Sequence, residues 1–258
     1  MKNIENMLLR VPEVALLFWI VKSLSTTVGE TTSDFFVNLG LGMPLVAIIV
    51  ALAMGVLFYM QFGKYKKYIP VIYWTLVVLM SIEGTLITDM LVDTMGVSLI
   101  TLTIVFSIAM LIGFALWHKR EGTLSIHSIN TTSREAYYWV VILIAFALGT
   151  AAGDLISEKL SQGYGVALAL FAGLIVIIAV AHYLFKLNSI LAFWLAYILT
   201  RPLGASLGDY LSQSPKDGGL GFGLGMINIV FFSIIVGSVF YMHSQINKNI
   251  ENFAKIRH

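Results

Sequence analysis

The chain has 258 residues, of which 58% are hydrophobic and 12% charged, and its formal net charge is +2. Soluble domains carry about 25% charged residues, and the mean hydropathy of this chain is +0.87. The composition therefore excludes an ordinary soluble enzyme or a nucleic-acid-binding protein and indicates an integral membrane protein. The absence of cysteine excludes disulfides, thiolate metal sites and cysteine nucleophiles.

Eight stretches are long and apolar enough to cross the roughly 30 Å hydrocarbon layer, which takes about 20 residues of helix. They are residues 12–38, 44–62, 69–92, 96–117, 136–160, 164–185, 190–212 and 222–243. The polar sequence between them is short, so we expect no separate extramembrane domain. The first stretch continues as a full span, and we expect it to be retained rather than cleaved as a signal peptide.

Lysine and arginine gather on one side of the predicted spans. With both termini on that side, it carries Lys2, Arg10, Lys64, Lys66, Lys67, Lys119, Arg120, Arg134, Lys186, Lys248, Lys255 and Arg257. The opposite side carries only Lys159 and Lys216. This asymmetry predicts that both termini lie in the cytoplasm, because cytoplasmic loops of membrane proteins are enriched in Lys and Arg.

One short pattern occurs four times, as GETTSD at 29–34, GTLITD at 84–89, GTAAGD at 149–154 and GASLGD at 204–209. A tryptophan lies ten residues before each glycine, at Trp19, Trp74, Trp139 and Trp194. The tryptophans are spaced 55, 65 and 55 residues apart, so the two halves superpose at an offset of 120. We predict an all-α transmembrane fold of eight helices, built as four two-helix repeats in two duplicated halves. The halves are residues 1–120 and 121–258, with a cytoplasmic linker at 118–135.

Every repeat starts and ends on the same side, so the four copies are predicted to run parallel, with a pseudo-symmetry axis along the membrane normal. The residue four positions after each repeat glycine is also small, which lets helix backbones approach closely. We therefore expect Gly29, Gly84, Gly149 and Gly204 to pack the odd-numbered helices into an inner cluster. The even-numbered helices should lie outside, facing lipid. The tryptophans are expected to anchor in the aromatic belt of the cytoplasmic interface.

Each repeat pattern ends in an aspartate within the outer third of its predicted span. A carboxylate inside the bilayer costs about 2.5–3.5 kcal/mol on insertion scales, so four equivalent ones indicate a function. The candidate ion or substrate site comprises Asp34, Asp89, Asp154 and Asp209, with Glu30 and Glu83 lying deeper. In the alternative interpretation, each aspartate caps the start of its own hairpin loop.

Two cations lie within the predicted spans. Lys22 is seven residues before Gly29, and Arg201 is three residues before Gly204. Both are candidates for gating groups, and both are candidates for counter-charges that neutralise two of the acids. Pro202 follows Arg201 and is expected to disturb the seventh helix, leaving carbonyl groups free to line a site.

The stretch EGTLSIHSINTTSREAYYW at 121–139, followed by FALGTAAGD, and the stretch FWLAYILTRPLGASLGD with GGLGFG carry a resemblance. They resemble a bacterial membrane-protein family that has four copies of a two-helix repeat of unknown function, each with a tryptophan. KSLSTTVGETTSD and GTLITD fit the same pattern, so the likeness covers nearly the whole chain. The resemblance implies eight helices in a bacterial inner membrane and adds no substrate.

Three classes of function fit these features. The first hypothesis is a transporter or channel for a cation, a divalent metal such as Mn or Mg exchanged for protons, with the four aspartates as metal ligands. The second is a proton-coupled carrier of a small organic or anionic solute that binds Lys22 and Arg201. The third is a structural or signalling membrane protein without transport. The sequence carries no nucleophile constellation, metalloprotease motif, Walker loop or dinucleotide fingerprint, so we expect the protein not to be an enzyme.

The expected partners are the lipid bilayer and a small ion or solute, without nucleic acid, and the sequence leaves the oligomeric state open. No resident cofactor is expected apart from a transported divalent cation. The linker at 118–135 is predicted to be a solvated connector between the halves. Its alternative role is a cytoplasmic gate that senses pH through His127.

Overall fold

The computed structural model describes residues 9–159 and 163–256, which form helices and no strands. The long helices are α2 (Leu16–Asn38), α3 (Met43–Tyr59), α4 (Pro70–Asp89), α5 (Leu99–Glu121), α6 (Thr132–Asp154), α7 (Tyr164–Tyr183), α8 (Ser189–Ser212) and α9 (Leu224–Ile256). Short π-helical segments extend three of them, at η1 (Met60–Tyr65), η2 (Met90–Thr94) and η4 (Leu155–Lys159). Two 3₁₀ turns, η3 (Ile126–Ser128) and η5 (Pro215–Asp217), lie between helices.

The predicted all-α fold is confirmed. Seven of the long helices in the described residues, all except α2, are long and apolar enough to cross a membrane. The sequence predicted eight such spans. Helix α2 falls below that apolarity because it carries Lys22, Glu30 and Asp34 among many serines and threonines. Residue 160, the predicted end of the fifth span, lies outside the described residues, as do Lys2 and Arg257.

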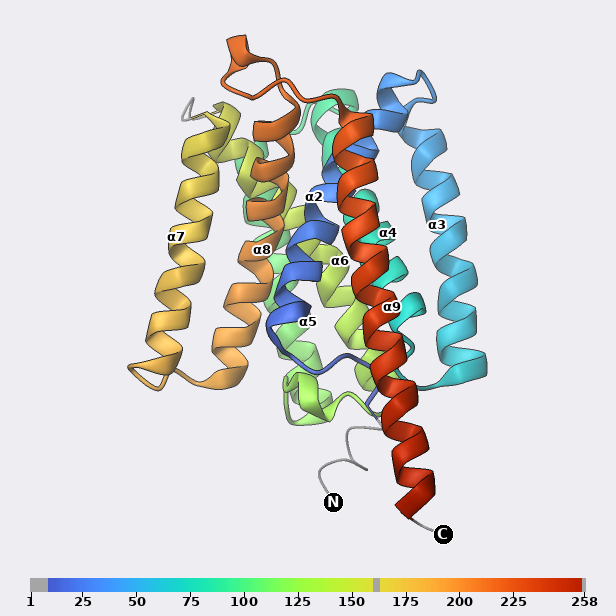
Figure 1. Ribbon diagram of the computed structural model, residues 1–258. Coiled ribbons are helices and arrows are strands. Elements are labelled where there is room, and N and C mark those ends of the chain that lie inside the picture. Colours follow the sequence, from blue (N-terminus) through green and yellow to red (C-terminus); the bar gives the residue numbers. More distant parts are fainter. Residues whose placement is uncertain (1–8, 160–162, 257–258) are drawn as a thin grey trace.

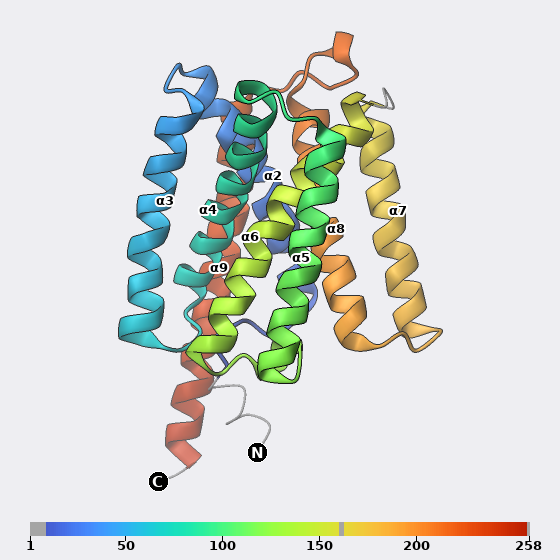
Figure 2. The same ribbon diagram turned by 180° about the vertical axis from the view of Figure 1, so that it is seen from behind.

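The four odd-numbered spans form the interior of the bundle, as predicted. In Figures 1 and 2, α2, α4, α6 and α8 lie between α3, α5, α7 and α9. In the apolar spans of α4, α6 and α8, 72%, 61% and 56% of the residues are buried within the bundle. The corresponding values for α3, α5, α7 and α9 are 22%, 11%, 11% and 22%. The outer helices therefore present their apolar side chains to the surroundings, which is how lipid-facing helices differ from soluble ones.

The packing of the helices follows a cycle. Helix α2 packs on α4, α4 on α6, α6 on α8, and α8 returns to α2, so the four inner helices form a ring. Each outer helix packs on the inner helix of the following repeat: α3 on α4, α5 on α6, α7 on α8 and α9 on α2. The last of these contacts joins the final helix to the first and closes the bundle. The predicted symmetry axis along the membrane normal stays a prediction.

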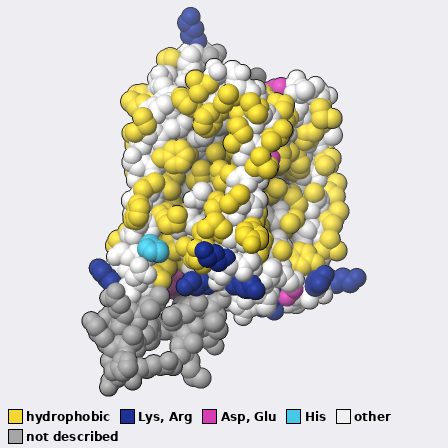
Figure 3. All heavy atoms as spheres, turned by 90° about the vertical axis from the view of Figure 1, so that its right-hand side faces the viewer, with side chains coloured by type: hydrophobic (Ala, Val, Ile, Leu, Met, Phe, Trp, Pro, Cys, Tyr) yellow, Lys and Arg dark blue, Asp and Glu magenta, His cyan; other side chains and the backbone are white. Residues whose placement is uncertain are grey.

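The two ends of the bundle differ in charge. Following the colours of Figure 1, the chain rises through the inner helices and descends through the outer ones, and the described residues begin and end at the lower end. We name this lower end the basic end, because it carries Lys64, Lys119, Arg120 and Lys186 at the termini of the outer helices. Figure 3 shows Lys and Arg side chains gathered there below a hydrophobic surface. The opposite end is the acidic end, because Asp34, Asp89, Asp154 and Asp209 lie at or near the ends of the inner helices there.

The repeat glycines lie at the contacts between the inner helices. A Cβ atom at Gly84 would lie 2.7 Å from Cβ of Phe146, and one at Gly149 would lie 2.6 Å from Cβ of Arg201. Gly204 faces Thr26 in the same way, with 2.7 Å to its Cβ. A Cβ at Gly29 would collide with the side chain of Ser81. Each glycine thus receives the residue three positions before the glycine of a neighbouring repeat, so the ring closes only without side chains at these four points.

A substitution pair tests this packing. We expect Gly149→Ala to lower the free energy of unfolding by about 1–3 kcal/mol, because the added methyl group would overlap the Arg201 side chain. Gly55→Ala on α3 is the matched control, because nothing lies within 4 Å of a Cβ at that position. This control should be neutral or slightly stabilising, since alanine has the higher helix propensity. Thermal unfolding of both variants in detergent measures the difference, and equal midpoints would contradict the packing role.

The repeat tryptophans form a buried aromatic layer near the basic end, so their prediction as lipid-interface anchors is wrong for most of them. Trp74, Trp139 and Trp194 are buried, and Trp19 is half-buried. The aromatic residue before each tryptophan contacts the tryptophan of the next repeat. The ring centroids are 5.6 Å apart for Phe18 and Trp74, 5.3 Å for Tyr73 and Trp139, 6.1 Å for Tyr138 and Trp194, and 5.7 Å for Phe193 and Trp19. These rings therefore pack neighbouring inner helices against one another instead of anchoring them at the lipid interface.

The linker between the halves is ordered against the bundle, which contradicts the prediction of a solvated connector at 118–135. Helix α5 extends to Glu121 and α6 begins at Thr132, so the linker is shorter than predicted. Ile126 and Ile129 are buried. Nε1 of Trp194 donates a hydrogen bond of 2.9 Å to the carbonyl oxygen of Leu124. The linker therefore covers the basic end of the inner ring beneath the aromatic layer.

Candidate functional site

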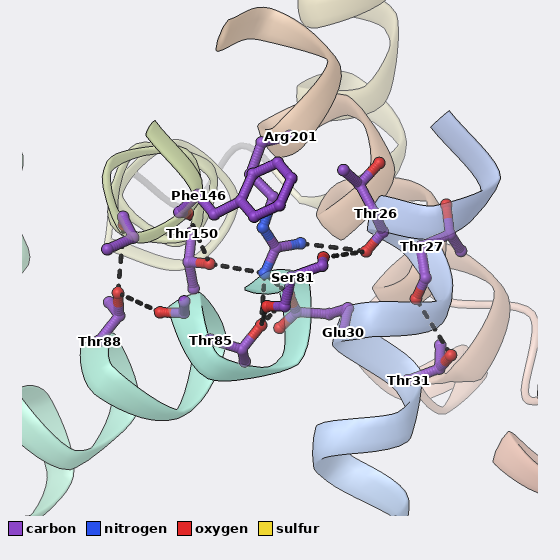
Figure 4. A network of polar contacts seen from close by, with 12 residues as sticks. Thr26, Thr27, Glu30, Thr31, Ser81, Thr85, Thr88, Phe146, Thr150 and Arg201 are labelled. Atoms are coloured by element: carbon purple, nitrogen blue, oxygen red, sulfur yellow. Dashed lines mark hydrogen bonds and ion pairs between the residues drawn. The ribbon is translucent and has the colours of Figure 1, made fainter. Parts of the chain in front are cut away.

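Arg201 lies at the centre of the inner ring and joins all four inner helices. Its side chain is fully buried. Nη2 donates to Oε2 of Glu30 on α2 at 2.8 Å and to the hydroxyl of Thr150 on α6 at 2.7 Å, and it also contacts the hydroxyl of Thr85 on α4. Nη1 donates to the carbonyl oxygen of Thr26 on α2 at 3.1 Å. Figure 4 shows these groups converging on the guanidinium from separate helices.

The site is assembled from two equivalent positions of the repeat. Three residues before the repeat glycine stand Thr26, Ser81, Phe146 and Arg201, and one residue after it stand Glu30, Thr85, Thr150 and Ala205. Positions four apart on a helix share one face, so the glycine contacts place both sets near the ring centre. At these two positions the fourth repeat supplies a cation, the first repeat supplies an anion, and the second and third repeats supply hydroxyl groups.

The hydroxyl groups complete the coordination of the ion pair. Thr85 donates to Oε2 of Glu30 at 3.2 Å, and Ser81 donates to the carbonyl oxygen of Thr26 at 3.4 Å. A buried ion pair is stable only when its remaining donors and acceptors are hydrogen-bonded. Most of the donors and acceptors here are satisfied. Nε of Arg201 has no hydrogen-bond partner in the described chain.

Lys22 is the second fully buried cation of the described residues and has no acidic partner among them. Its side chain is fully buried, and its Nζ has no hydrogen-bond acceptor in that part of the chain. The ammonium lies 4.2 Å from the ring centroid of Phe146 and 4.3 Å from that of Tyr197, and the charge of Arg201 opposes it. Cation–π contacts of this kind contribute about 2 kcal/mol when desolvated, less than the several kcal/mol lost on burying an ion. The Lys22 amino group therefore has hydrogen-bond donors without an acceptor among the described residues.

Of the two cations predicted to neutralise acids within the spans, one forms an ion pair in the structure. Arg201 pairs with Glu30, whereas Lys22 pairs with two aromatic rings. Glu30 is the one carboxylate that pairs with either of these two side chains among the described residues.

The structure brings some of the predicted acids together and leaves others apart. Asp89 lies within electrostatic range of Glu30, Asp34 and Asp93, and of the Arg201 guanidinium. Asp209 is buried, and Asp154 is half-buried near the end of α6. Within residues 9–159 and 163–256, no group of three or more His, Asp or Glu side chains is arranged to hold a metal ion. The acids of α2 and α4 form one electrostatic group, but the predicted four-aspartate metal centre is not formed in this conformation.

Glu83 differs from its predicted role, whereas the disturbance of the seventh helix expected at Pro202 stays a prediction. Glu83 is half-buried, and its Oε2 has no hydrogen-bond partner among the described residues. It therefore does not join the Arg201 cluster. Helix α8 continues through Pro202 as far as Ser212, and the backbone carbonyl that meets the cluster from α8 is that of Thr200, which accepts from the Thr26 hydroxyl at 3.0 Å.

Sequence reasoning missed Thr26 and Ser81. Their signal lay in their position, three residues before the repeat glycine, which they share with Arg201. The four residues at that position are two hydroxyl residues, a phenylalanine and an arginine, so no shared motif marks them.

A family model described as Repeat of Unknown Function matches the chain at residues 17–66, 72–123, 137–188 and 192–245. Each match spans one inner helix and the outer helix that follows, which agrees with the two-helix repeat described above. A search of curated proteins and a search of solved structures each found no match. The matched segments cover most of the chain and confirm the resemblance given by the sequence motifs: the chain belongs to the family of the Repeat of Unknown Function (DUF347).

Proposed function

We propose that this protein is a proton-coupled carrier of a small organic anion, a solute that bears a carboxylate. The observation that carries the proposal is the pair of fully buried cations, Lys22 and Arg201, of which Lys22 lacks an acceptor in the described chain. A buried ammonium without an acceptor is unfavourable. A solute carboxylate between the two cations would supply that acceptor.

Charge balance gives the coupling. Without solute, Lys22, Arg201 and Glu30 carry two positive charges and one negative charge. A solute carboxylate that binds Arg201 displaces Glu30, and a carboxylate without its counter-charge in a buried site takes up a proton. The site then holds two positive charges, the solute anion and a neutral Glu30, so its net charge is unchanged. One proton should accompany each anion, and transport should be electroneutral.

The surroundings of the site suit alternating access. The aromatic layer and the linker close the basic end below Lys22. Asp89 and Asp34 lie on the other side of Glu30, toward the acidic end, and can pass protons to it. We infer that the basic end faces the cytoplasm of a bacterial inner membrane, because of its excess of Lys and Arg.

Uptake into proteoliposomes tests the proposal. Purified protein is reconstituted with a pH-sensitive dye inside, and acetate, lactate, benzoate and octanoate are added outside in turn. We expect at least one carboxylate to acidify the lumen faster than in protein-free liposomes, at a rate unchanged when valinomycin and potassium clamp the membrane potential. A rate that follows the membrane potential would contradict electroneutral coupling. Absence of carboxylate-dependent acidification would contradict the carrier.

Transport of a divalent cation in exchange for protons is the second candidate. It is favoured by the carboxylates of Glu30, Asp34 and Asp93 around Asp89, since hard divalent ions take oxygen ligands. Against it, a cation crossing the ring would meet Arg201 and Lys22. Addition of Mn²⁺ or Mg²⁺ to the same liposomes should alkalinise the lumen if this candidate is correct, because metal entry would drive proton exit.

A further inference from the structure

A lateral groove lies between α2, α7 and α8 in the half of the bundle nearer the basic end. Its volume is about 540 Å³, within the range of about 300–1,000 Å³ typical of small-molecule sites. Its walls are largely apolar, with Ile175, Ile178 and Ala179 from α7, Ala196 from α8 and Trp19 from α2. Helix α7 packs on α8 and stands away from α2, which leaves the groove between them.

The mouth of the groove carries polar side chains. His127 of the linker and His182 of α7 line it together with Ser125 and Ser189. Nδ1 of His182 lies 2.9 Å from the carbonyl oxygen of Leu187. A carbonyl oxygen only accepts, so Nδ1 carries the proton of this bond, and Nε2 donates to a ligand only when the ring binds a second proton. The groove therefore has an apolar body and a mouth where the hydroxyl groups of Ser125 and Ser189 can donate to an anionic head group.

The deep end of the groove reaches the wall of the buried cation site. Ser23 and Thr200 line it, and they neighbour Lys22 and Arg201 in the chain. The Thr26 hydroxyl donates to the carbonyl oxygen of Ser23 at 2.7 Å and to that of Thr200 at 3.0 Å. The carbonyl oxygen of Thr26 in turn accepts from Nη1 of Arg201. Thr26, at the contact of α2 and α8, thus links two residues that line the groove to the guanidinium.

We propose that the groove binds the transported solute on its way to the cations, and that the solute is an amphiphilic carboxylate with an apolar body of about the size of octanoate. This inference rests on the proposed carrier function. A small hydrophilic anion would gain nothing from apolar walls, whereas each methylene group buried there raises affinity about fourfold. The carboxylate of the ligand can accept from the serine hydroxyls at the mouth, and its charge is opposite to that of Lys22 and Arg201 behind the floor.

Quenching of Trp19 tests occupancy of the groove without any transport step. Protein in nanodiscs is titrated with 8-bromooctanoate, whose bromine quenches a tryptophan that it contacts, and with bromoacetate as the short-chain comparison. We expect saturable quenching by 8-bromooctanoate, none by bromoacetate, and loss of the saturable signal in Trp19→Phe. Quenching that persists in Trp19→Phe would place the ligand elsewhere and overturn the inference.

Two alanines of α7 give a matched pair of variants. Ala179 lines the groove, whereas Ala169 is exposed on the same helix and does not line it. Ala179→Phe should raise the half-saturating concentration of 8-bromooctanoate at least tenfold and slow octanoate uptake, and Ala169→Phe should change neither. Equal behaviour of the two variants would overturn the groove as the binding site.

The outcomes separate this inference from the proposed function. Arg201→Gln should keep Trp19 quenching and lose uptake, because it removes the inner site and leaves the groove. If acetate and octanoate are taken up equally and Ala179→Phe is silent, the amphiphile inference fails and the carrier stands. If quenching behaves as expected but no carboxylate is taken up, the groove binds an amphiphile and the carrier proposal fails.

Discussion

Replacing Arg201 with glutamine is expected to lower the free energy of unfolding by about 3–5 kcal/mol, the usual effect of removing one partner of a buried ion pair. The change leaves the Glu30 carboxylate buried without its counter-charge and deprives the Thr85 and Thr150 hydroxyls of a shared donor. It should also abolish carboxylate uptake, because the solute loses the cation that replaces its hydration. Thermal unfolding in detergent and the liposome assay measure the two effects.

The double variant Arg201→Gln with Glu30→Gln separates structure from function. Two amides can hydrogen-bond to each other and leave no uncompensated charge, so most of the lost stability should return. Uptake should stay absent, since no guanidinium remains to bind the solute. If the double variant transports carboxylates at the wild-type rate, the solute does not bind at Arg201. If the single variant unfolds like the wild type, the ion pair does not hold the inner helices together.

The repeat made the fold predictable. A glycine followed four residues later by a small residue predicted that the first helix of each repeat lies inside, and the burial of α4, α6 and α8 agrees. The cyclic order of contacts was not predictable, because a repeat spacing does not say which neighbour each glycine meets. That Gly204 packs on Thr26 follows only once the last repeat is placed beside the first.

The aromatic residues show where sequence reasoning failed. Tryptophan near a helix end is typical both of a lipid interface and of a tightly packed interior, and one sequence does not distinguish them. The signal that favoured the interior was the aromatic residue immediately before each tryptophan, since adjacent residues on a helix point about 100° apart. The two adjacent rings of one repeat can therefore reach different neighbours. Tyr73, which precedes Trp74, contacts Trp139 of the next repeat.

The sequence predicted which charged residues lie within the spans, but it did not predict which of them form an ion pair. Glu30, Lys22 and Arg201 were recognised because ionisable residues within spans are costly and therefore functional by default. Which cation meets Glu30 depends on helix rotation. Arg201 extends across the ring from the position opposite Gly149, whereas Lys22 lies one turn nearer the basic end and meets Phe146 and Tyr197 instead.

Replacing Lys22 with methionine should raise the stability of the protein and weaken solute binding, whereas Arg201→Gln should lower both stability and uptake. Methionine has a similar length and makes favourable contacts with aromatic rings, so it fits against Phe146 and Tyr197. The substitution removes the burial penalty of an ammonium, several kcal/mol, and its repulsion by Arg201. It loses cation–π contacts of about 2 kcal/mol. We therefore expect the free energy of unfolding to rise by on the order of 1 kcal/mol.

Solute affinity should fall in the same Lys22→Met variant by about 10- to 150-fold, the equivalent of one charged hydrogen bond of about 1.5–3 kcal/mol. Ile142→Met is the matched control, because Ile142 is fully buried seven residues before Gly149, as Lys22 is before Gly29. This control exchanges side chains of similar volume and should shift stability by less than about 1.5 kcal/mol without changing uptake. A more stable protein that no longer binds carboxylate would show that Lys22 is retained for its charge. A less stable one with normal uptake would show that the ammonium serves the fold, and the carrier proposal would lose the observation that carries it.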